Sequence, residues 1–193
     1  MDQPALRQAH PACLHSPQIS LLGEVNESMV ERLLNGIAEA GNGSGDIAVE
    51  LTTAGGDAEL GRRIVLEIQS ARERLRDRRF LFLGKTQVYS AGITIMSAFP
   101  CEDRYLTRDA VLLIHGRQLD TSFEISGPMR SSLPEVIALK EQIELGLKHE
   151  DENFRRLIEG CDIGIDEVRE KALHGWYQQA REALDRGLVA GVI

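Results

Sequence analysis

A short apolar run that is followed by a turn and a second apolar segment constrains the fold more than any other part of this sequence. The run Phe80–Leu83 is bounded by Gly84, and four apolar residues are typical of a buried strand and too few for a helix. Ile93–Phe99 is apolar almost throughout and predicts a buried helix. The small residues Ser90–Gly92 (Ser-Ala-Gly) precede it. The sequence therefore predicts a strand, a sharp turn that carries a serine, and a helix.

Two interpretations of Ser90 are open from the turn alone. At a sharp turn between a strand and a helix, a serine hydroxyl can stand beside free backbone N–H groups and near the positive end of the helix dipole, which suits a nucleophile. Serine is also common at helix starts because its oxygen caps free N–H groups. The other parts of the chain must decide between these two interpretations.

Strand and helix patterns alternate along the first half of the chain. Apolar runs predict strands at Ile19–Leu22, Ile47–Leu51 and Phe80–Leu83, and residues at intervals of three and four predict a helix in each gap between them. This alternation favours βαβ units, hence an α/β fold with a parallel sheet whose strand ends offer loops for a site. Two further short strands are predicted at Asp103–Leu106 and Val111–Ile114.

Two of these predicted strands end in residues that suit a reaction site. Gly55 and Gly56 follow the second strand, and adjacent glycines there let the backbone approach a ligand with its N–H groups free to bind an anion. His115 follows the strand Val111–Ile114, where a general base would be presented. A plain tight turn and a hydrogen-bonded structural histidine are the corresponding alternatives.

The longest periodic segment, residues 133–158, predicts one helix of about 25 residues, longer than a small core can cover. We expect it to project and to pack against another subunit. Residues 1–18 contain three prolines and no apolar period, and we expect a mobile N-terminal arm there. Residues 19–193 then form a single domain. A further short helix is predicted from Ala180, stopped at Gly187 and followed by an apolar tail.

Composition excludes several classes of function. The net charge of −8 over 193 residues argues against a nucleic-acid surface, which needs a basic face. No apolar window is long enough to span a membrane, and the N-terminus lacks a signal-peptide pattern. Three widely separated cysteines provide neither a zinc motif nor a disulfide framework. We therefore expect a cytoplasmic protein that uses no metal or other cofactor.

Four short segments occur in a fixed order along the chain. They are Thr52–Gly56 (Thr-Thr-Ala-Gly-Gly), Tyr89–Gly92 (Tyr-Ser-Ala-Gly), Leu112–His115 (Leu-Leu-Ile-His) and Ala183–Val189 (Ala-Leu-Asp-Arg-Gly-Leu-Val). This series resembles the proteolytic subunit of the Clp protease (ClpP), a serine peptidase family in the larger ClpP/crotonase group. The corresponding family segments are Asn-Ser-Pro-Gly-Gly, Ala-Ser-Met-Gly, a strand ending in Met-Ile-His, and Ala-x-x-x-Gly-Leu-Val/Ile. The 25-residue spacing of the serine and the histidine is also that of the family.

The resemblance implies a spiral of βαβ units with a projecting handle helix, and a catalytic apparatus. Carried over by position, Ser90 is the nucleophile, His115 the general base, and the N–H groups of Gly56 and Ala91 the oxyanion hole. It also implies a serine-type endopeptidase that cleaves peptides or unfolded proteins, assembles as a homo-oligomer, and can work with an ATP-dependent unfoldase. No cofactor is implied.

The sequence departs from the family at the third member of the triad. Alignment back from Gly187 places Gly175, in Leu173–Tyr177, where the family has an aspartate. Another carboxylate, a backbone carbonyl or a neutral side chain must then orient His115. The alternative function is a structural or regulatory ClpP-like subunit with little or no activity. An acyl-CoA enzyme of the crotonase kind is a third possibility, which the short chain and the Ser-His spacing disfavour.

Overall fold

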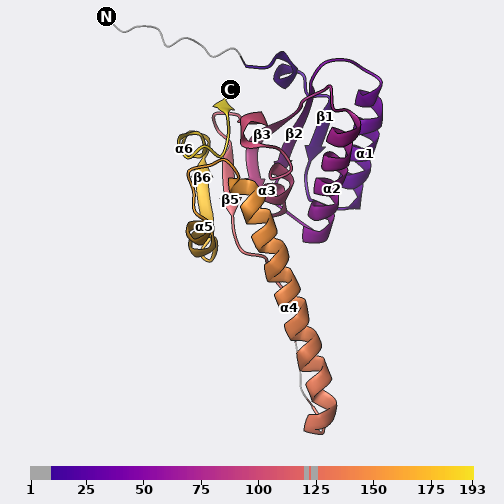
Figure 1. Ribbon diagram of the computed structural model, residues 1–193, viewed down its shortest axis with the longest axis vertical. Helices are drawn as coiled ribbons and strands as arrows, with labels where there is room; N and C mark the ends of the chain where they lie inside the picture. The colour runs from indigo at the N-terminus through magenta and orange to yellow at the C-terminus, as the bar shows by residue number, and fades with distance from the viewer. Residues whose placement is uncertain (1–9, 120–121, 123–125) are drawn as a thin grey trace, which may run out of the picture.

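The computed structural model describes residues 10–119, 122 and 126–193. Among these residues, helices pack around a seven-stranded sheet, and one long helix leaves the body of the domain (Figure 1). This mixed α/β architecture with a mostly parallel sheet confirms the predicted fold class. No helix in the described part of the chain is both long and apolar enough to cross a membrane.

The first part of the sheet follows the predicted alternation. In chain order it contains β1 (Ile19–Leu22), α1 (Glu27–Gly41), β2 (Ile47–Thr53), α2 (Ala58–Arg74) and β3 (Phe80–Tyr89). The three strands are parallel neighbours in the order β1-β2-β3. Both α1 and α2 begin with a capping side chain. The Asn26 side chain accepts a hydrogen bond from the Met29 N–H, and the Asp57 carboxylate accepts bonds from the N–H groups of Glu59 and Leu60.

Strand β3 is longer than the sequence predicted, and it changes partners midway. Its first half pairs with β4 (Arg104–Leu106), and its second half, Gln87–Tyr89, pairs with β5 (Val111–Ile114). Between the halves, Thr86 has a φ of 51°, and the register against β2 shifts. The expectation that the strand ends at Gly84 is therefore wrong, because this bulge redirects the chain onto a second neighbour instead of ending the ladder.

Two strands near the C-terminus were not predicted. Strand β6 (Trp176–Gln179) pairs antiparallel with β5, and β7 (Gly191–Val192), which we expected as an apolar tail, pairs with β4. Four further helices belong to the body of the domain: α3 (Ala91–Met96), the 3-10 helix η2 (Cys101–Asp103), α5 (Ile165–Ala172) and α6 (Ala180–Asp185).

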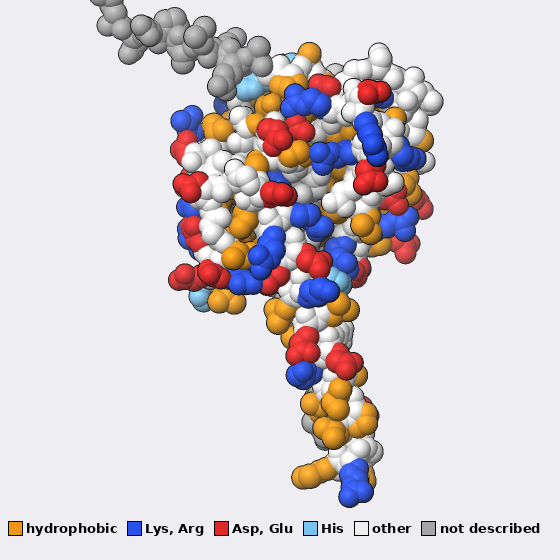
Figure 2. All heavy atoms as spheres, viewed as in Figure 1, with side chains coloured by type: hydrophobic (Ala, Val, Ile, Leu, Met, Phe, Trp, Pro, Cys, Tyr) orange, Lys and Arg blue, Asp and Glu red, His pale blue; other side chains and the backbone are white. Residues whose placement is uncertain are grey.

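The long helix α4 (Met129–Ile158) projects from the domain, as Figure 1 shows in orange. Near its C-terminal end, Phe154 and Leu157 are buried in the core. Elsewhere the helix exposes seven large apolar side chains: Met129, Leu133, Val136, Ile137, Ile143, Leu145 and Leu147. Figure 2 shows apolar side chains along the projecting helix. The helix projects because its large apolar side chains are buried only near this end.

The N-terminal segment contacts the outer side of the sheet. The 3-10 helix η1 (Ala12–His15) places Leu14, which is 2% exposed, against a small cluster that contains Ala48 and Leu81. Gln18 extends this contact, because its side-chain oxygen accepts a hydrogen bond from the Ala48 N–H at 2.7 Å. Residues 1–9 of the expected arm lie outside the described residues.

One charged residue is buried in the core near the end of α4. Arg104, on β4, is 1% exposed. Its guanidinium donates to the carbonyl oxygens of Phe99 at 2.7 Å, Leu157 at 2.6 Å, Leu188 at 3.3 Å and Arg156 at 3.2 Å. These bonds join β4 to α4 and to the C-terminal segment, so Arg104 holds the base of the projecting helix.

Candidate active site

Ser90 lies at the junction of β3 and α3, and its backbone is held from both sides. Its N–H donates to the carbonyl of Leu113 on β5 at 3.0 Å, and its carbonyl accepts from the Ile93 N–H at 2.9 Å. Its hydroxyl makes no capping hydrogen bond to α3, in contrast to the helix-cap interpretation. The hydroxyl therefore remains available at the turn.

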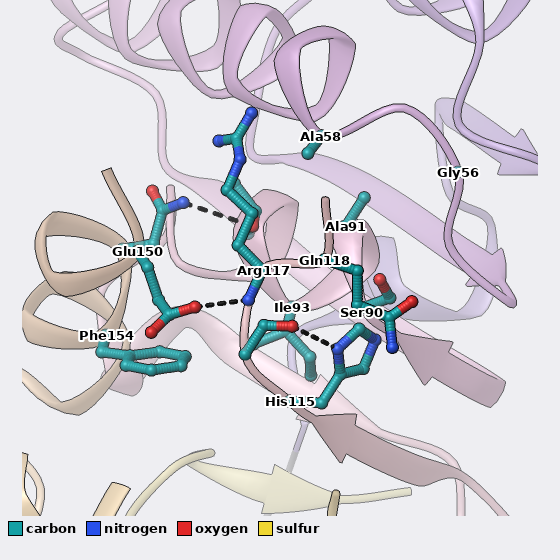
Figure 3. Close-up of a pocket in the computed structure, with 13 residues that line it drawn as sticks. Gly56, Ala58, Ser90, Ala91, Ile93, His115, Arg117, Gln118, Glu150 and Phe154 are labelled. Carbon is teal, nitrogen blue, oxygen red and sulfur yellow. Dashed lines mark hydrogen bonds between the residues drawn. The ribbon is translucent and has the colours of Figure 1, made fainter. Parts of the chain in front are cut away.

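The backbone of Ser90 adopts a conformation that side-chain-bearing residues rarely use. Its φ is 57° and its ψ is −117°. Such a conformation costs free energy and persists where the surrounding structure fixes the chain on both sides. The sharp reversal turns the Ser90 side chain out of the sheet and into a pocket (Figure 3).

Two backbone N–H groups near Ser90 lack acceptors among the described residues. Gly56 has a φ of 144° and bridges to Val25, but the hydrogen bonds of that bridge use the carbonyl of Gly55 and the N–H of Asp57. The N–H of Gly56 is left free. Ala91 is the first residue of α3, where an N–H has no partner within the helix.

Close packing requires glycine at both positions of the pair before α2. A Cβ added to Gly56 would lie 2.5 Å from the carbonyl oxygen of Val25, and one added to Gly55 would lie 2.7 Å from the Cβ of Ser90. The backbone of this segment thus approaches the serine as closely as the chain allows. Both the free N–H of Gly56 and that of Ala91 belong to residues that line the serine's pocket.

His115 follows β5, the strand that neighbours the end of β3. Its Nδ1 lies 2.7 Å from the carbonyl oxygen of Gly116. A carbonyl oxygen can only accept a hydrogen bond, so Nδ1 carries the proton, and Nε2 of the neutral ring is a free base. Ser90 and His115 line the same pocket, although no hydrogen bond joins them in the described structure (Figure 3).

The pocket beside Ser90 has a volume of about 150 Å³. Its wall combines apolar and polar side chains from α2, α3, α4 and the segment after β5: Ala58, Ile93, Thr94, Arg117, Gln118, Glu150, Asn153 and Phe154. A short side chain of a bound molecule fits such a volume. No cluster of three or more metal-ligating side chains occurs in the described ranges.

Glu150 and Arg117 are site residues that the sequence did not reveal. Glu150, on α4, accepts a hydrogen bond from the backbone N–H of Arg117. The Arg117 side chain forms an ion pair with Glu59 on α2. Arg117 therefore contacts α4 through its backbone and α2 through its side chain. Burial raises the pKa of the Glu59 carboxyl, but hydrogen bonds and charges from Arg117 and Arg62 outweigh it, so that the pKa is lowered. No motif marks either residue, because both contacts join segments far apart in the sequence.

Gly175 lies next to His115, where the family resemblance places the third triad residue. The antiparallel register pairs Ile114 with Trp176, so the next pair in the ladder direction is His115 and Gly175. Gly175 has a φ of 77° and no side chain to offer. Within the described residues, no carboxylate forms an ion pair or a hydrogen bond with His115. A backbone carbonyl orients its ring instead.

Comparison with known proteins places the fold. Neither models of protein families nor curated proteins match the sequence. Among solved structures, a mutant of ClpP1 from Listeria monocytogenes matches with a TM-score of 0.72 at 18% identity, over 93% of this chain and 92% of that one. The chain has a ClpP-like fold. The match extends over nearly the whole chain, so the arrangement of sheet and helices is ClpP-like.

Proposed function

We propose that this chain is a serine-type peptidase of the Clp kind, with Ser90 as nucleophile and His115 as general base. The observation that supports it most is the combination at the β3–α3 turn: an uncapped serine hydroxyl in a strained conformation, with two free N–H groups and an imidazole around the same pocket. A turn with only a structural role needs none of these together.

The proposed reaction has a role for each of these groups. Nε2 of His115 takes the proton of the Ser90 hydroxyl as Oγ attacks the carbonyl carbon of a peptide bond. The N–H groups of Gly56 and Ala91 donate to the oxyanion that forms, and removal of one such donor costs about 10²–10³ in rate in other serine peptidases. The protonated His115 then gives its proton to the departing amine, and water hydrolyses the acyl-enzyme by the same steps.

Assembly and partners form a second part of the proposal. The seven exposed apolar side chains of α4 support a homo-oligomer in which this helix packs on another copy of the chain. Peptides or unfolded proteins are the proposed substrates. An ATP-dependent unfoldase is a possible partner that no feature of the described residues supports directly. The unpaired cysteines agree with the expected cytoplasmic location.

Gly175 supports the second candidate, a structural or regulatory ClpP-like subunit with little activity. A triad without its acid loses about 10⁴ in rate in the best-studied template. The crotonase-like acyl-CoA alternative would use the same N–H pair for a thioester, but nothing else in the pocket favours it.

A fluorophosphonate probe distinguishes the first two candidates. We expect one adduct per chain by intact mass in the wild type, and none in Ser90→Ala or His115→Ala. Ser97→Ala is the matched control, since Ser97 lies on the same segment and its hydroxyl is bonded to the carbonyl of Thr94 at 2.7 Å. Absence of an adduct in folded, assembled wild type would refute the peptidase proposal and favour the structural subunit.

A further inference from the structure

Two hydrogen bonds meet at a single peptide group beside the candidate active site. The carbonyl oxygen of Gly116 accepts from Nδ1 of His115 at 2.7 Å, and the N–H of Arg117 donates to Oε2 of Glu150. This carbonyl and this N–H belong to one planar peptide unit. Both bonds are dashed in Figure 3. The imidazole and the carboxylate are therefore connected through one peptide group.

We propose that Glu150 takes over the task of the missing triad acid, acting on His115 through the peptide group between Gly116 and Arg117. Glu150 is thus a positioning residue rather than a catalytic one, because it acts on His115 only through the peptide group to which it is hydrogen-bonded. The catalytic part of this inference rests on the proposed function. The effect of Glu150 on the hydrogen bond of the His115 ring does not depend on that function.

The coupling follows from the electronic structure of the peptide group. When its N–H donates to a carboxylate, the group is polarised and its carbonyl oxygen becomes a stronger acceptor. The bond from Nδ1 of His115 is strengthened, which holds the tautomer with Nε2 unprotonated. The negative charge of Glu150 also favours the imidazolium that forms when the ring takes a proton. Because a peptide separates the two groups, the effect is smaller than that of a directly bonded aspartate.

The surrounding contacts hold this peptide group in place. The N–H of Gly116 donates to the carbonyl of Ala172, at the end of α5, at 3.1 Å. A Cβ on Gly116 would lie 3.3 Å from Oε2 of Glu150, so glycine lets the carboxylate approach closely. The segment is thus fixed by α5 on one side and by α4 on the other.

The charge of Glu150 is not neutralised by a cation. In the part of the chain that the structure describes, Glu150 forms no ion pair. The other ionisable side chains that line the pocket are His115 and Arg117, and the guanidinium of Arg117 is paired with Glu59. The main polar partner of the Glu150 carboxylate is therefore the peptide group that also accepts the hydrogen bond from His115.

Nuclear magnetic resonance of the His115 ring tests the coupling without reference to activity. Glu150→Gln keeps an oxygen for the Arg117 N–H but removes the charge, and we expect the Nδ1–H proton resonance of His115 to move upfield, because its hydrogen bond to the Gly116 carbonyl weakens. Glu152→Gln removes the same charge from an exposed position on the same helix and should leave this resonance unchanged. The five histidines are assigned by their single substitutions, each to glutamine.

The rate of fluorophosphonate labelling tests the catalytic consequence. We expect Glu150→Gln to label about tenfold more slowly than wild type, which corresponds to about 1.4 kcal/mol. Glu150→Asp, which restores the charge with a shorter reach, should lie between the two, and Glu152→Gln should match wild type.

The two measurements separate failure of this inference from failure of the proposed function. If wild type is labelled at Ser90 but Glu150→Gln leaves the His115 Nδ1–H resonance and the labelling rate unchanged, the coupling is refuted and the peptidase proposal stands. If no chain is labelled but this resonance moves upfield in Glu150→Gln, the coupling stands and the peptidase proposal falls. If neither labelling nor a change of the resonance occurs, both are overturned.

Discussion

Ser90→Gly and Ser90→Ala both remove the proposed nucleophile, but the glycine variant should be the more stable of the two. Ser90 has a φ of 57° and a ψ of −117°, a conformation that a glycine adopts without steric cost. Ser90→Ala removes the same hydroxyl but keeps the Cβ, and with it the strain. The difference in stability between these two variants therefore measures the free-energy cost of the backbone conformation at position 90.

The expected difference can be worked from three contributions. A residue held in such a conformation costs about 1–3 kcal/mol, which glycine releases. Glycine loses more backbone freedom on folding, which costs about 0.5–1 kcal/mol. It also gives up the packing of the Ser90 Cβ, which lies over Gly55 so closely that a Cβ there would be only 2.7 Å away. We expect Ser90→Gly to be about 1 kcal/mol more stable than Ser90→Ala, or about 2–4 °C in Tm for a domain of this size.

Urea unfolding followed by circular dichroism measures the difference, provided that both variants unfold with the same m-value. Ser97 supplies the matched control because it has an ordinary helical backbone, with a φ of −64°. There, glycine should be less stable than alanine by about 0.5–1 kcal/mol. If glycine is also the less stable residue at position 90, no strain is stored at the turn and the reasoning fails.

Two further predictions concern the core. Arg104→Met should lower the free energy of unfolding by about 2–4 kcal/mol in urea titration, since it removes the guanidinium donor from three buried carbonyl oxygens and from a fourth that is partly buried. Burial and the neighbouring Cys101 raise the pKa of the Cys161 thiol to about 12, so Cys161 should react with iodoacetamide at pH 8 far more slowly in the folded than in the unfolded protein, as peptide mass spectrometry would show. Because the folded pKa exceeds the unfolded value, this thiol should also make stability fall as the pH rises above about 9, and equal labelling of the two states would contradict both expectations.

The sequence predicted the elements whose burial follows a period, and it missed those that a distant partner defines. The strand Val111–Ile114 has the predicted bounds, because its apolar residues form a run. Strand β6 (Trp176–Gln179) carries no such run and exists because β5 offers it an antiparallel edge. The continuation of β3 past Gly84 likewise depends on the change of partner from β4 to β5.

The candidate site divides in the same way. Ser90, Gly56 and His115 each follow a strand, and parallel strands bring their ends to one edge of the sheet, so their common location was predictable. Glu150 is one acidic residue among many on a long amphipathic helix, and only the fold shows that it reaches the N–H of Arg117. The orientation of His115 by a carbonyl was one of three options in the sequence, and the structure contains that one.

The projecting helix joins its exposed tip to the pocket beside Ser90 through one continuous element. About 20 residues of α4 separate its exposed tip from Glu150, which is about 30 Å of continuous helix. The helix is clamped at its base, where Phe154 and Leu157 are buried and Arg104 bonds its last carbonyls. A force on the exposed tip would therefore rotate the helix about these contacts, and Glu150 lies one helical turn from them. Contacts at the tip of α4 would thus shift the Glu150 carboxylate relative to the peptide group beside His115.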